Sequence, residues 1–346
     1  MKHDEFIEHG GIHPNYSEEM DYFKKGKIYS IQIEANTACN QGCLFCYASS
    51  DNASTKELPQ KNIIKILNSA ASLEVKAIDW LGGDPLLRRD WVELFKYANE
   101  KGLINNIWTS GIPLKDRNSA RNAVDLTKGG FISVHLDTLD ETLYKKLHKG
   151  NPKKQINLIL QGVDNVQEFG KEPDSMINCI TFSKLLTDDV KKTIKYFFEK
   201  KGMRTCLTQM CETGLAKDHP EWIPNKEEIK NACGIRDKIN YPNSKLSIST
   251  MDTNKYYCGA MICITVDGDV TPCSVIRKGF GNIYKQTLED IVEKYRKELL
   301  FLKLREHKNL PENCSSCENN SICWGCRAIA FYESGDICGS DPKCFK

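Results

Sequence analysis

Between residues 30 and 215, short apolar segments alternate with longer segments in which apolar residues recur at helical spacing. This alternation is typical of repeated βα units around a parallel sheet. The apolar segments predict six strands: Ile31–Glu34, Ala77–Leu81, Ile104–Thr109, Phe131–Asp137, Met176–Thr181 and Arg204–Met210. The longer segments predict five helices that pack against the sheet: Gln60–Leu73, Trp91–Lys101, Asn118–Lys128, Gln155–Phe169 and Asp188–Lys201. The fold class is therefore α/β, and the six strands predict a partial (β/α)6 barrel of the TIM-like type.

The regular alternation ends near Gly214, where the composition changes. Prolines interrupt a polar stretch that contains one predicted helix, Asn225–Asn240. From residue 258 onward the sequence predicts a hairpin, a helix and a small cysteine-rich domain. The hairpin strands and the helix are Ile262–Val266, Val270–Cys273 and Leu288–Arg305. The chain thus divides into an N-terminal segment at 1–28, a core at 29–217, a bridging region at 218–257 and a C-terminal domain at 258–346.

Composition excludes several classes of partner. The 346 residues are 40% hydrophobic and 27% charged, as in ordinary soluble proteins, and the net charge is only +2. Such a balance gives no electrostatic signature for nucleic acid or for anionic lipid. No apolar run follows the N-terminus, and no stretch approaches the roughly 18 apolar residues of a membrane span. We therefore expect a cytoplasmic protein that has neither nucleic acid nor a membrane as partner.

Sixteen cysteines are the outlying feature of the composition. A reducing compartment does not sustain disulfides, so clustered cysteines there more often bind metal or perform redox chemistry. Cys39, Cys43 and Cys46 directly follow the first predicted strand, at the end of the barrel where active sites of such folds lie. Three thiolates at this spacing can hold three irons of a cubane cluster and leave the fourth iron without a protein ligand. An open coordination position makes a metal site catalytic instead of structural.

This Cys-x3-Cys-x2-Cys loop resembles the signature of the radical S-adenosylmethionine (SAM) superfamily. The resemblance implies that SAM chelates the unique iron of a 4Fe–4S cluster on Cys39, Cys43 and Cys46. It also implies reductive cleavage of SAM to a 5′-deoxyadenosyl radical, an electron donor such as flavodoxin or ferredoxin, and a position beside the adenine for Phe45. The alternative is a zinc site or three unrelated buried thiols.

The second predicted strand ends in Gly82-Gly83-Asp84-Pro85, which resembles the family's Gly-Gly-Glu-Pro motif. In the family this motif accepts a hydrogen bond from the methionyl amine of SAM. The two glycines allow close backbone approach. Asp84 replaces the usual glutamate, which shortens the reach of the carboxylate, and the bare motif alone is also compatible with a turn.

Polar residues on later strands are further candidates for SAM contacts. Period-two alternation places Ser133, His135 and Asp137 on one face of the fourth strand. The resemblance implies that Ser133 and Asp137 contact the ribose or the methionyl carboxylate, with Asn178 on the fifth strand as a further ribose candidate. His135 is either a hydrogen-bonded core histidine or a functional group. The turn at 213–216 is similar to one that passes near the adenine in relatives.

The remaining cysteines of the C-terminal domain follow a second recognisable pattern. Cys258 and Cys273 flank a glycine, and the pairs Cys314/Cys317 and Cys323/Cys326 precede a final cysteine, Cys344. The pattern resembles the SPASM extension, a domain built around two auxiliary 4Fe–4S clusters, so that three clusters are expected in all. It departs from the commonest form in the interval between Cys323 and Cys326, which is two residues instead of three, and in two additional cysteines, Cys263 and Cys338.

The SPASM resemblance implies a ligand set for each auxiliary cluster. Cys258, Cys273 and Cys326 hold the cluster nearer the active site, with Cys263 as its expected fourth ligand. If Cys263 is not a ligand, this cluster has an open iron that can touch substrate. The outer cluster is held by Cys314, Cys317, Cys323 and Cys344. Two four-cysteine zinc sites are the alternative, and we interpret the cysteines without matching spacing, Cys179, Cys206, Cys211 and Cys233, as buried apolar thiols.

The sequence constrains the substrate less than the cofactors. Auxiliary clusters beside a radical site suit oxidative modification, and most SPASM enzymes act on a peptide or a protein side chain, while another set matures tetrapyrroles. Only about 30 residues precede the first strand, too few for a fused winged-helix peptide-recognition domain. Ser274 stands where sulfatase-maturing relatives place a catalytic aspartate. Peptide or protein modification is our first expectation, and tetrapyrrole side-chain processing is the close alternative.

Four arginines are candidates for the propionate contacts that would distinguish a tetrapyrrole enzyme: Arg88, Arg89, Arg204 and Arg277. The ending from Cys326 to Cys344 also resembles the heme-pathway and quinone-cofactor branches. Hypotheses of other classes are a non-catalytic iron–sulfur electron carrier, which would not bind SAM, and a zinc-stabilised binding module. An electron carrier has no need of an open iron, so the loop at Cys39–Cys46 argues against it.

Overall fold

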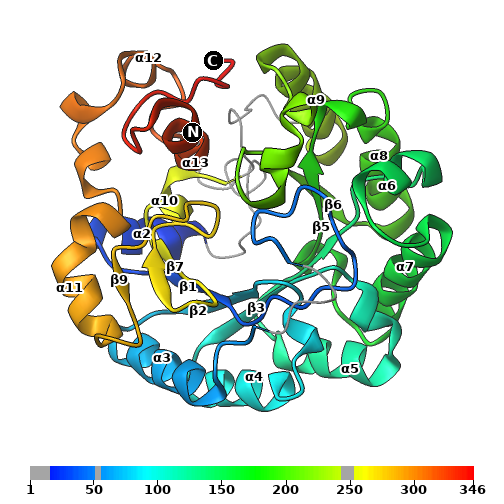
Figure 1. Cartoon of the computed structure of the whole chain (residues 1–346), viewed down its shortest axis with the longest axis horizontal. Coiled ribbons are helices and arrows are strands. Elements are labelled where there is room, and N and C mark those ends of the chain that lie inside the picture. Colours follow the sequence, from blue (N-terminus) through cyan, green and yellow to red (C-terminus); the bar gives the residue numbers. More distant parts are fainter. Residues whose placement is uncertain (1–15, 51–55, 243–252) are drawn as a thin grey trace.

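Six parallel strands form the α/β core that the sequence predicts (Figure 1). The computed structural model describes residues 16–50, 56–242 and 253–346, so parts of the predicted segments 1–28 and 218–257 lie outside the described residues. The strands are β1 Ser30–Glu34, β2 Ala77–Leu81, β3 Ile104–Thr109, β4 Ile132–His135, β5 Met176–Phe182 and β6 Arg204–Gln209. Their order is β6-β5-β4-β3-β2-β1, with every neighbouring pair parallel. The fold is the expected partial (β/α)6 barrel.

Amphipathic helices cover the outer face of these strands (Figure 1). They are α3 Gln60–Ser72, α4 Trp91–Glu100, α5 Arg117–Leu126, α7 Pro152–Glu168 and α8 Val190–Lys201. All five were predicted, with boundaries within a few residues. The largest shift is at α7, which begins at Pro152 instead of Gln155 because Asn151 caps it by accepting the Lys154 amide at 2.9 Å. Proline is favoured in the first turn of a helix, where its missing N–H is not needed.

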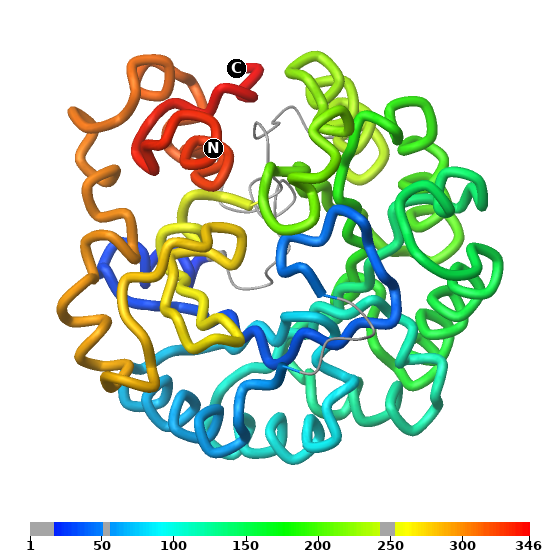
Figure 2. Tube along the Cα trace, viewed as in Figure 1, coloured from blue at the N-terminus to red at the C-terminus, as the bar shows by residue number. Residues whose placement is uncertain are grey.

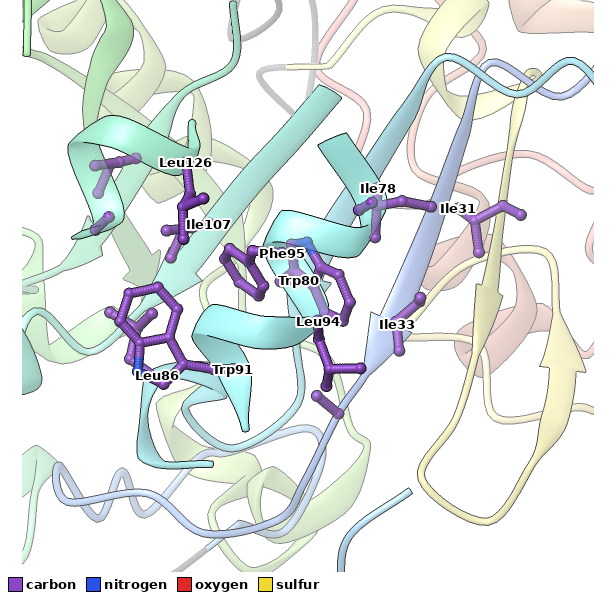
Figure 3. Close-up of a cluster of buried hydrophobic side chains, with 14 of the residues drawn as sticks. Ile31, Ile33, Ile78, Trp80, Leu86, Trp91, Leu94, Phe95, Ile107 and Leu126 are labelled. Carbon is purple, nitrogen blue, oxygen red and sulfur yellow. The ribbon is translucent and has the colours of Figure 1, made fainter. Parts of the chain in front are cut away.

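Strand residues alternate between an apolar outer layer and a polar interior. Trp80 faces the helices, stacks on Phe95 of α4 with ring centroids 4.4 Å apart, and donates its indole N–H to Asn105 (Figure 3). On the opposite face of the same strands, the Asp79 carboxylate accepts hydrogen bonds from Ser30 and Asn106, both at 2.7 Å. The outer layer stabilises the sheet by apolar burial, whereas the interior carries hydrogen-bonding groups.

The C-terminal hairpin extends the core sheet. β7 Met261–Ile264 pairs in parallel with β1, and β8 Asp269–Thr271 and β9 Gly281–Asn282 follow in antiparallel order. The predicted helix 288–305 is in fact two elements, α11 Leu288–Leu299 and a 3-10 turn at Leu302–Arg305. Phe301 separates them with a left-handed backbone (φ 48°) that no α-helix accommodates.

Six further helices complete the described structure, and only one of them, α9, was predicted from the sequence. These are α2 Tyr16–Lys25, α6 Glu141–Leu147, α9 Lys226–Asn240, α10 Lys255–Cys258, α12 Glu312–Ser315 and α13 Arg327–Ser334. Short 3-10 turns lie at Pro85–Leu87, Ile112–Lys115, Pro173–Ser175, Lys184–Leu186, Gly214–Asp218, Pro220–Trp222 and His307–Asn309. Among these, α9 was expected, and its predicted first residue, Asn225, is the cap of a capping box with Glu228. No helix in the described part of the chain is long and apolar enough to cross a membrane.

The trace shows how the parts surround the barrel (Figure 2). The C-terminal segment (red) and the segment that contains α9 (light green) lie on opposite sides of the open edge of the barrel. The loop that follows β1 (blue) lies below both segments in this view, inside the ring of helices. Residues distant in sequence therefore face one another around this loop.

The buried carboxyl of Glu19 provides a test of how α2 packs on the core. Glu19 is fully buried, and burial, with a smaller contribution from the Asp79 charge, raises its pKa to about 8. An acid whose folded pKa lies above its ordinary value of 4.5 contributes stability at low pH that is lost as the pH rises towards that folded pKa.

We therefore expect Glu19→Gln, which cannot ionise, to be more stable than wild type at pH 8.5. Its free energy of unfolding should be higher by on the order of 3 kcal/mol, and it should unfold at a higher urea concentration. The difference should shrink as the pH falls and vanish below about pH 5. Urea unfolding followed by circular dichroism across this range measures it, with the exposed Glu293→Gln as control. A difference independent of pH would contradict burial of an ionisable carboxyl as the cause.

Candidate active site and cysteine clusters

The loop that carries Cys39, Cys43 and Cys46 is tied to the barrel mouth by hydrogen bonds from distant segments. The Leu44 amide donates at 2.9 Å to the carbonyl of Leu147, the last residue of α6. The Gln41 side chain donates to the carbonyl of His135, at the end of β4, at 2.8 Å. The loop is therefore held by the ends of the strands and not by its own residues alone, which fixes the direction of the three thiols.

The three thiols lie close together in a buried environment. Burial, then the Asp84 charge, raises the pKa of Cys39 to about 12. Burial also raises the pKa of Cys43 well above its ordinary value, and the neighbouring Cys39 and Cys46 add to the rise. Thiolates in such a place need a compensating positive charge. A metal cluster supplies that charge and displaces the thiol protons.

Backbone N–H groups point at two of these sulfurs. The amides of Gln41 and Gly42 donate to the Cys39 sulfur, and the Ser50 amide donates to the Cys46 sulfur at 3.4 Å. N–H···S hydrogen bonds stabilise thiolates and are among the factors that set the potentials of iron–sulfur clusters. The donor set therefore fits a thiolate-bound cluster.

The Gly82-Gly83 turn packs directly against the backbone that leads into this loop. A Cβ atom on Gly82 would stand 2.4 Å from the Asn36 carbonyl oxygen, and one on Gly83 would stand 2.2 Å from that of Ala38. The Gly83 amide donates to the Asn36 carbonyl at 2.7 Å. Only glycine allows this contact, so the turn sets the position of Cys39.

Asp84 completes the turn with both of its carboxylate oxygens engaged. One oxygen accepts from the Leu86 amide at 3.1 Å. The other accepts from the Thr109 hydroxyl at 2.8 Å and from the amide and hydroxyl of Ser110 at 2.9 and 2.6 Å. The side chain is fully buried and joins the end of β2 to the end of β3.

Asp137 lies at the centre of a buried charged group beside the loop. One of its oxygens is 2.9 Å from the Nε2 atoms of both His135 and His148, and the other accepts from the Thr181 amide. Burial opposes ionisation, but the charge and hydrogen bond of His135, together with His148, hold the pKa of Asp137 well below its usual range. Burial tends to lower the pKa of His135, but Asp137 raises it well above its ordinary value, whereas burial leaves the pKa of His148 lowered. His135 and Asp137 thus form an ion pair.

Four thiols of the C-terminal domain form an outer group. Burial raises the pKa of Cys314 to about 11, and the nearby Cys344, Cys323 and Cys317 contribute to the rise. The amide of Asn319 donates to the Cys317 sulfur at 3.4 Å, and that of Gly325 donates to the Cys323 sulfur at 3.2 Å. These are the four cysteines that the sequence places together.

A second group lies between the outer group and the barrel. Burial raises the pKa of Cys258 to about 12 and that of Cys273 to about 11, and the charge of Cys326 contributes in both cases. Cys263 is fully buried on β7, opposite Thr271 of β8, and its nearest charged neighbours are Glu34 and Arg277. Cys211, interpreted from the sequence as a buried apolar thiol, packs against the same apolar cluster as Cys273 and Cys326, and Cys326 is the first of the influences that raise its pKa.

In residues 16–50, 56–242 and 253–346, no three Cys, His, Asp or Glu side chains converge tightly enough to bind a single metal ion. A cubane cluster is larger than one ion, so its thiolate ligands stand further apart than those of a zinc ion. The thiols of the described residues are therefore spaced more widely than a single zinc ion requires.

A cavity of about 400 Å³ opens between the loop and the C-terminal domain. Tyr47 comes from the loop, Thr213 and Lys217 from the turn after β6, and Arg277 and Lys278 from the C-terminal domain. A Cβ atom on Gly214, in the same turn, would stand 2.3 Å from the Cys46 carbonyl oxygen. The turn therefore touches the cysteine loop and also forms one wall of the cavity.

Comparison with known families decides the class of the protein. A family model described as the radical SAM superfamily matches residues 33–197, and one described as an iron-sulfur cluster-binding domain, SPASM, matches residues 258–318. The chain belongs to the radical SAM superfamily. It is a radical SAM enzyme with a C-terminal SPASM domain, and its cofactors are 4Fe–4S clusters and SAM.

The similarity to known proteins extends over nearly the whole chain. The sequence is 24% identical over 344 residues to an AdoMet-dependent heme synthase of Methanosarcina barkeri, covering 91% of this chain and 95% of that protein. The Streptococcus suis protein SuiB bound to precursor peptide SuiA matches with a TM-score of 0.67 at 18% identity, over 96% of this chain and 80% of its own. The anSMEcpe structure with bound AdoMet matches with a TM-score of 0.67 at 15% identity, over 91% of this chain and 93% of its own. At these identities the two structures show a shared fold.

The residues expected to contact SAM differ in whether their polar groups are already hydrogen-bonded to the protein. Ser133 is buried on β4 in register with Trp108, and its hydroxyl has no hydrogen-bond partner among the described residues, so it is free for a ligand. Phe45 packs with its ring 5.6 Å from that of His148. Asn178 does not join this group, because both ends of its amide bond the backbone of Leu136 at 3.1 Å.

Asp84 and Asp137 are also committed to protein partners. For both, the observed role is to position neighbouring segments, and a direct contact with SAM would have to share an oxygen that already accepts hydrogen bonds. No motif in the sequence pointed to His148, whose partner Asp137 lies eleven residues away. None pointed to Cys211 either, because neither residue belongs to a spaced motif.

Gly83→Ala tests the close packing behind the cysteine loop. Because the new methyl group would stand 2.2 Å from the Ala38 carbonyl oxygen, the segment before Cys39 must shift. We expect reconstituted protein to lose about four irons and its SAM cleavage, measured by iron analysis and by 5′-deoxyadenosine release.

The matched control is Gly234→Ala in α9, where a Cβ atom meets nothing within 4 Å. It should keep its iron and gain about 1 kcal/mol of stability, as expected for glycine replaced within a helix. Full iron content in Gly83→Ala would show that this contact does not position the ligands.

Proposed function

We propose that this enzyme cleaves SAM at a cluster on Cys39, Cys43 and Cys46 and oxidatively modifies a carboxylate-bearing substrate in the adjoining cavity. When bound, the cluster and SAM supply the electron and the 5′-deoxyadenosyl radical. The observation that carries the substrate class is the cationic lining of the cavity by Lys217, Arg277 and Lys278.

Two of the three cations are available to a ligand. Arg277 is paired through both of its terminal nitrogens with Glu34, which leaves it little net charge to offer. Among the described residues, neither Lys217 nor Lys278 forms an ion pair with a carboxylate. Two unneutralised ammonium groups at a cavity wall favour an anionic group there by charge-assisted hydrogen bonds.

The lining also suits a flat apolar body. Tyr47, Phe331 and Tyr332 line the same cavity, and its volume of about 400 Å³ is within the range of small-ligand sites. The Tyr332 hydroxyl is held in place, since it donates to the Val275 carbonyl at 3.0 Å and accepts from the Arg277 amide at 3.1 Å. A lining that combines aromatic side chains with cations matches a ring system that carries acidic side chains.

A tetrapyrrole is therefore the first candidate substrate. Tetrapyrroles of the heme pathway are flat and carry propionate side chains, and one relative that matches over nearly the whole chain is a heme synthase. Of the four arginines considered from the sequence, only Arg277 lines the cavity. Arg88 instead binds the carbonyls of Ala35 and Leu58, and Arg204 packs on Tyr241.

Modification of a peptide or protein side chain, our first expectation from the sequence, is the second candidate. The observation in its favour is that the same lysines suit the carboxylate of an aspartate or glutamate side chain. Both candidates share the carboxylate, so the substrates tested must separate them.

We propose three clusters, with the outer auxiliary cluster on Cys314, Cys317, Cys323 and Cys344 and the nearer one on Cys258, Cys273 and Cys326. The support is the mutual proximity of the thiols in each group. Ser133, Phe45 and the Gly82-Gly83 backbone are the proposed contacts for SAM. A flavodoxin or ferredoxin is the proposed electron donor.

Iron counting with SAM cleavage tests the enzyme class. Anaerobically reconstituted protein should hold about twelve irons and release 5′-deoxyadenosine when reduced with SAM. Replacement of Cys39, Cys43 and Cys46 by Ala should abolish release and leave about eight irons. Replacement of the buried Cys233 by Ala is the control, which should keep both the full iron content and the release of 5′-deoxyadenosine. No deoxyadenosine from reduced, fully loaded wild type would refute the enzyme, and zinc in place of iron would support the binding-module hypothesis.

Removal of the two lysine charges tests the substrate class. Lys217→Met and Lys278→Met should each raise KM for a propionate-bearing tetrapyrrole about tenfold with little change in kcat, since each loses one charge-assisted contact. Product formation is measured by mass spectrometry, with Lys191→Met on the outer surface of α8 as control.

The same assay is run with the methyl esters of the tetrapyrrole and with an acidic peptide. Esters that react as well as the free acid would refute carboxylate recognition. If the enzyme turned over the acidic peptide and not the tetrapyrrole, peptide modification would become the supported function.

A further inference from the structure

Cys211 lies where a lone buried thiol is not expected. It follows β6 on the turn that continues to Thr213, in the core part of the chain, yet it packs in one apolar cluster with Cys273 and Cys326 of the SPASM domain. The Thr213 hydroxyl, two residues further on, donates to the Tyr332 hydroxyl of α13 at 3.3 Å, and Cys326 is the first of the influences that raise the pKa of Cys211. Two thiols from segments so distant in sequence meet only because the C-terminal domain folds back onto the barrel mouth.

Cys211 completes a group of four neighbouring thiols. Cys326, burial and the charge of Cys273 raise the pKa of Cys211, so both thiols lie close to it. Cys258 is in turn near both Cys273 and Cys326. A cubane cluster requires four thiols around a common centre, and here Cys211, Cys273 and Cys326 pack in one cluster while Cys258 adjoins the last two.

Cys263 is placed less well for the same centre. It is in register with Gln32 of β1 and Thr271 of β8, inside the sheet. Burial aside, the charges that most affect its pKa are those of Glu34 and Arg277, followed by that of Cys273. A ligand at this position would stand inside the sheet, beside the Glu34 carboxylate.

Backbone donors support thiolates at the two neighbours of Cys211. The amides of Ala328 and Ile329, at the start of α13, donate to the Cys326 sulfur, and those of Val275 and Ile276 donate to the Cys273 sulfur. The place is therefore suited to anionic sulfurs, which only a cationic partner can hold close together.

We propose that Cys211, and not Cys263, is the fourth ligand of the auxiliary cluster held by Cys258, Cys273 and Cys326. Binding breaks the S–H bond of Cys211, forms an S–Fe bond and releases the proton to solvent, with no change in oxidation state. The proposal rests on the three-cysteine assignment of this cluster made above, but not on the identity of the substrate.

A closed cluster has two consequences for the proposed function. No iron of this cluster is open to substrate, so its role is to transfer electrons. The ligand also fastens the turn from Cys211 to Gly214, which abuts the backbone of Cys46 and carries the cavity wall at Thr213 and Lys217. The nearer auxiliary cluster would thus hold one wall of the substrate cavity in place.

The test uses the full-length chain in which Cys39, Cys43 and Cys46 are replaced by Ala, so that its spectra report only the auxiliary clusters. Into this background we place Cys211→Ala, Cys263→Ala and the control Cys233→Ala. Iron content, Mössbauer spectra and electron paramagnetic resonance of the reduced protein are recorded with and without added cyanide as a ligand for an open iron. Circular dichroism checks the fold of each variant.

The background protein should hold about eight irons and show no response to cyanide. Cys211→Ala should either bind cyanide with a shifted resonance or lose one to four irons, while Cys263→Ala and Cys233→Ala match the background. A change in Cys263→Ala alone, or a cyanide response already present in the background, would overturn the proposal. So would spectra that are unchanged in all variants.

If Cys211→Ala and Cys263→Ala both misfold and lose iron, the corresponding serine variants show which residue is the ligand. Cys211→Ser supplies an oxygen ligand, so four irons with an altered Mössbauer quadrupole splitting at one iron are expected, with Cys263→Ser unaltered. The reverse pattern would overturn the proposal. SAM cleavage is not a readout here, so failure of this proposal is distinguished from failure of the enzymatic one.

Discussion

The structure depends on the position of β1 between two parallel neighbours, β2 from the core and β7 from the C-terminal domain. The strand is short, and all five of its residues are buried. Its inward-facing side chains bind the C-terminal domain: Gln32 accepts the Ser274 amide at 3.1 Å, and Glu34 pairs with Arg277. The same strand leads directly into the loop that carries Cys39. The cysteine loop and the C-terminal domain are thus attached to one rigid element.

Buried charge and its compensation recur throughout the site. Burial alone makes ionisation of the thiols costly, as the raised pKa values of Cys39, Cys258 and Cys273 show. Backbone N–H groups offset only part of that cost. Iron supplies the rest, so assembly of the clusters and folding of the loops around them are expected to be coupled. The pair of Asp137 and His135 needs no metal, because each group compensates the charge of the other.

Much of the fold could be predicted because its signals are local. Strand bounds at Ala77–Leu81 and Ile104–Thr109 agree with the structure, since a short apolar segment bounded by turn signals indicates a buried strand directly. Errors occurred where backbone geometry intervened, as at Phe301, whose left-handed conformation ends α11 before Arg305. At Asn178 the polarity suggested a ligand contact, and in the structure its amide bonds the backbone of Leu136, a partner that the sequence does not reveal.

By itself the sequence determined the βα alternation, the cysteine loop after β1 and the spaced cysteines of the C-terminal domain. These features depend on periodicity and spacing within short segments, which the chain encodes locally. Only the tertiary structure decided that Cys211 meets Cys326, that Arg277 pairs with Glu34, and that two lysines from different domains face one cavity. Such contacts join segments that are remote in sequence, and they arise from the way β7 and α13 pack onto the barrel, for which no local pattern exists.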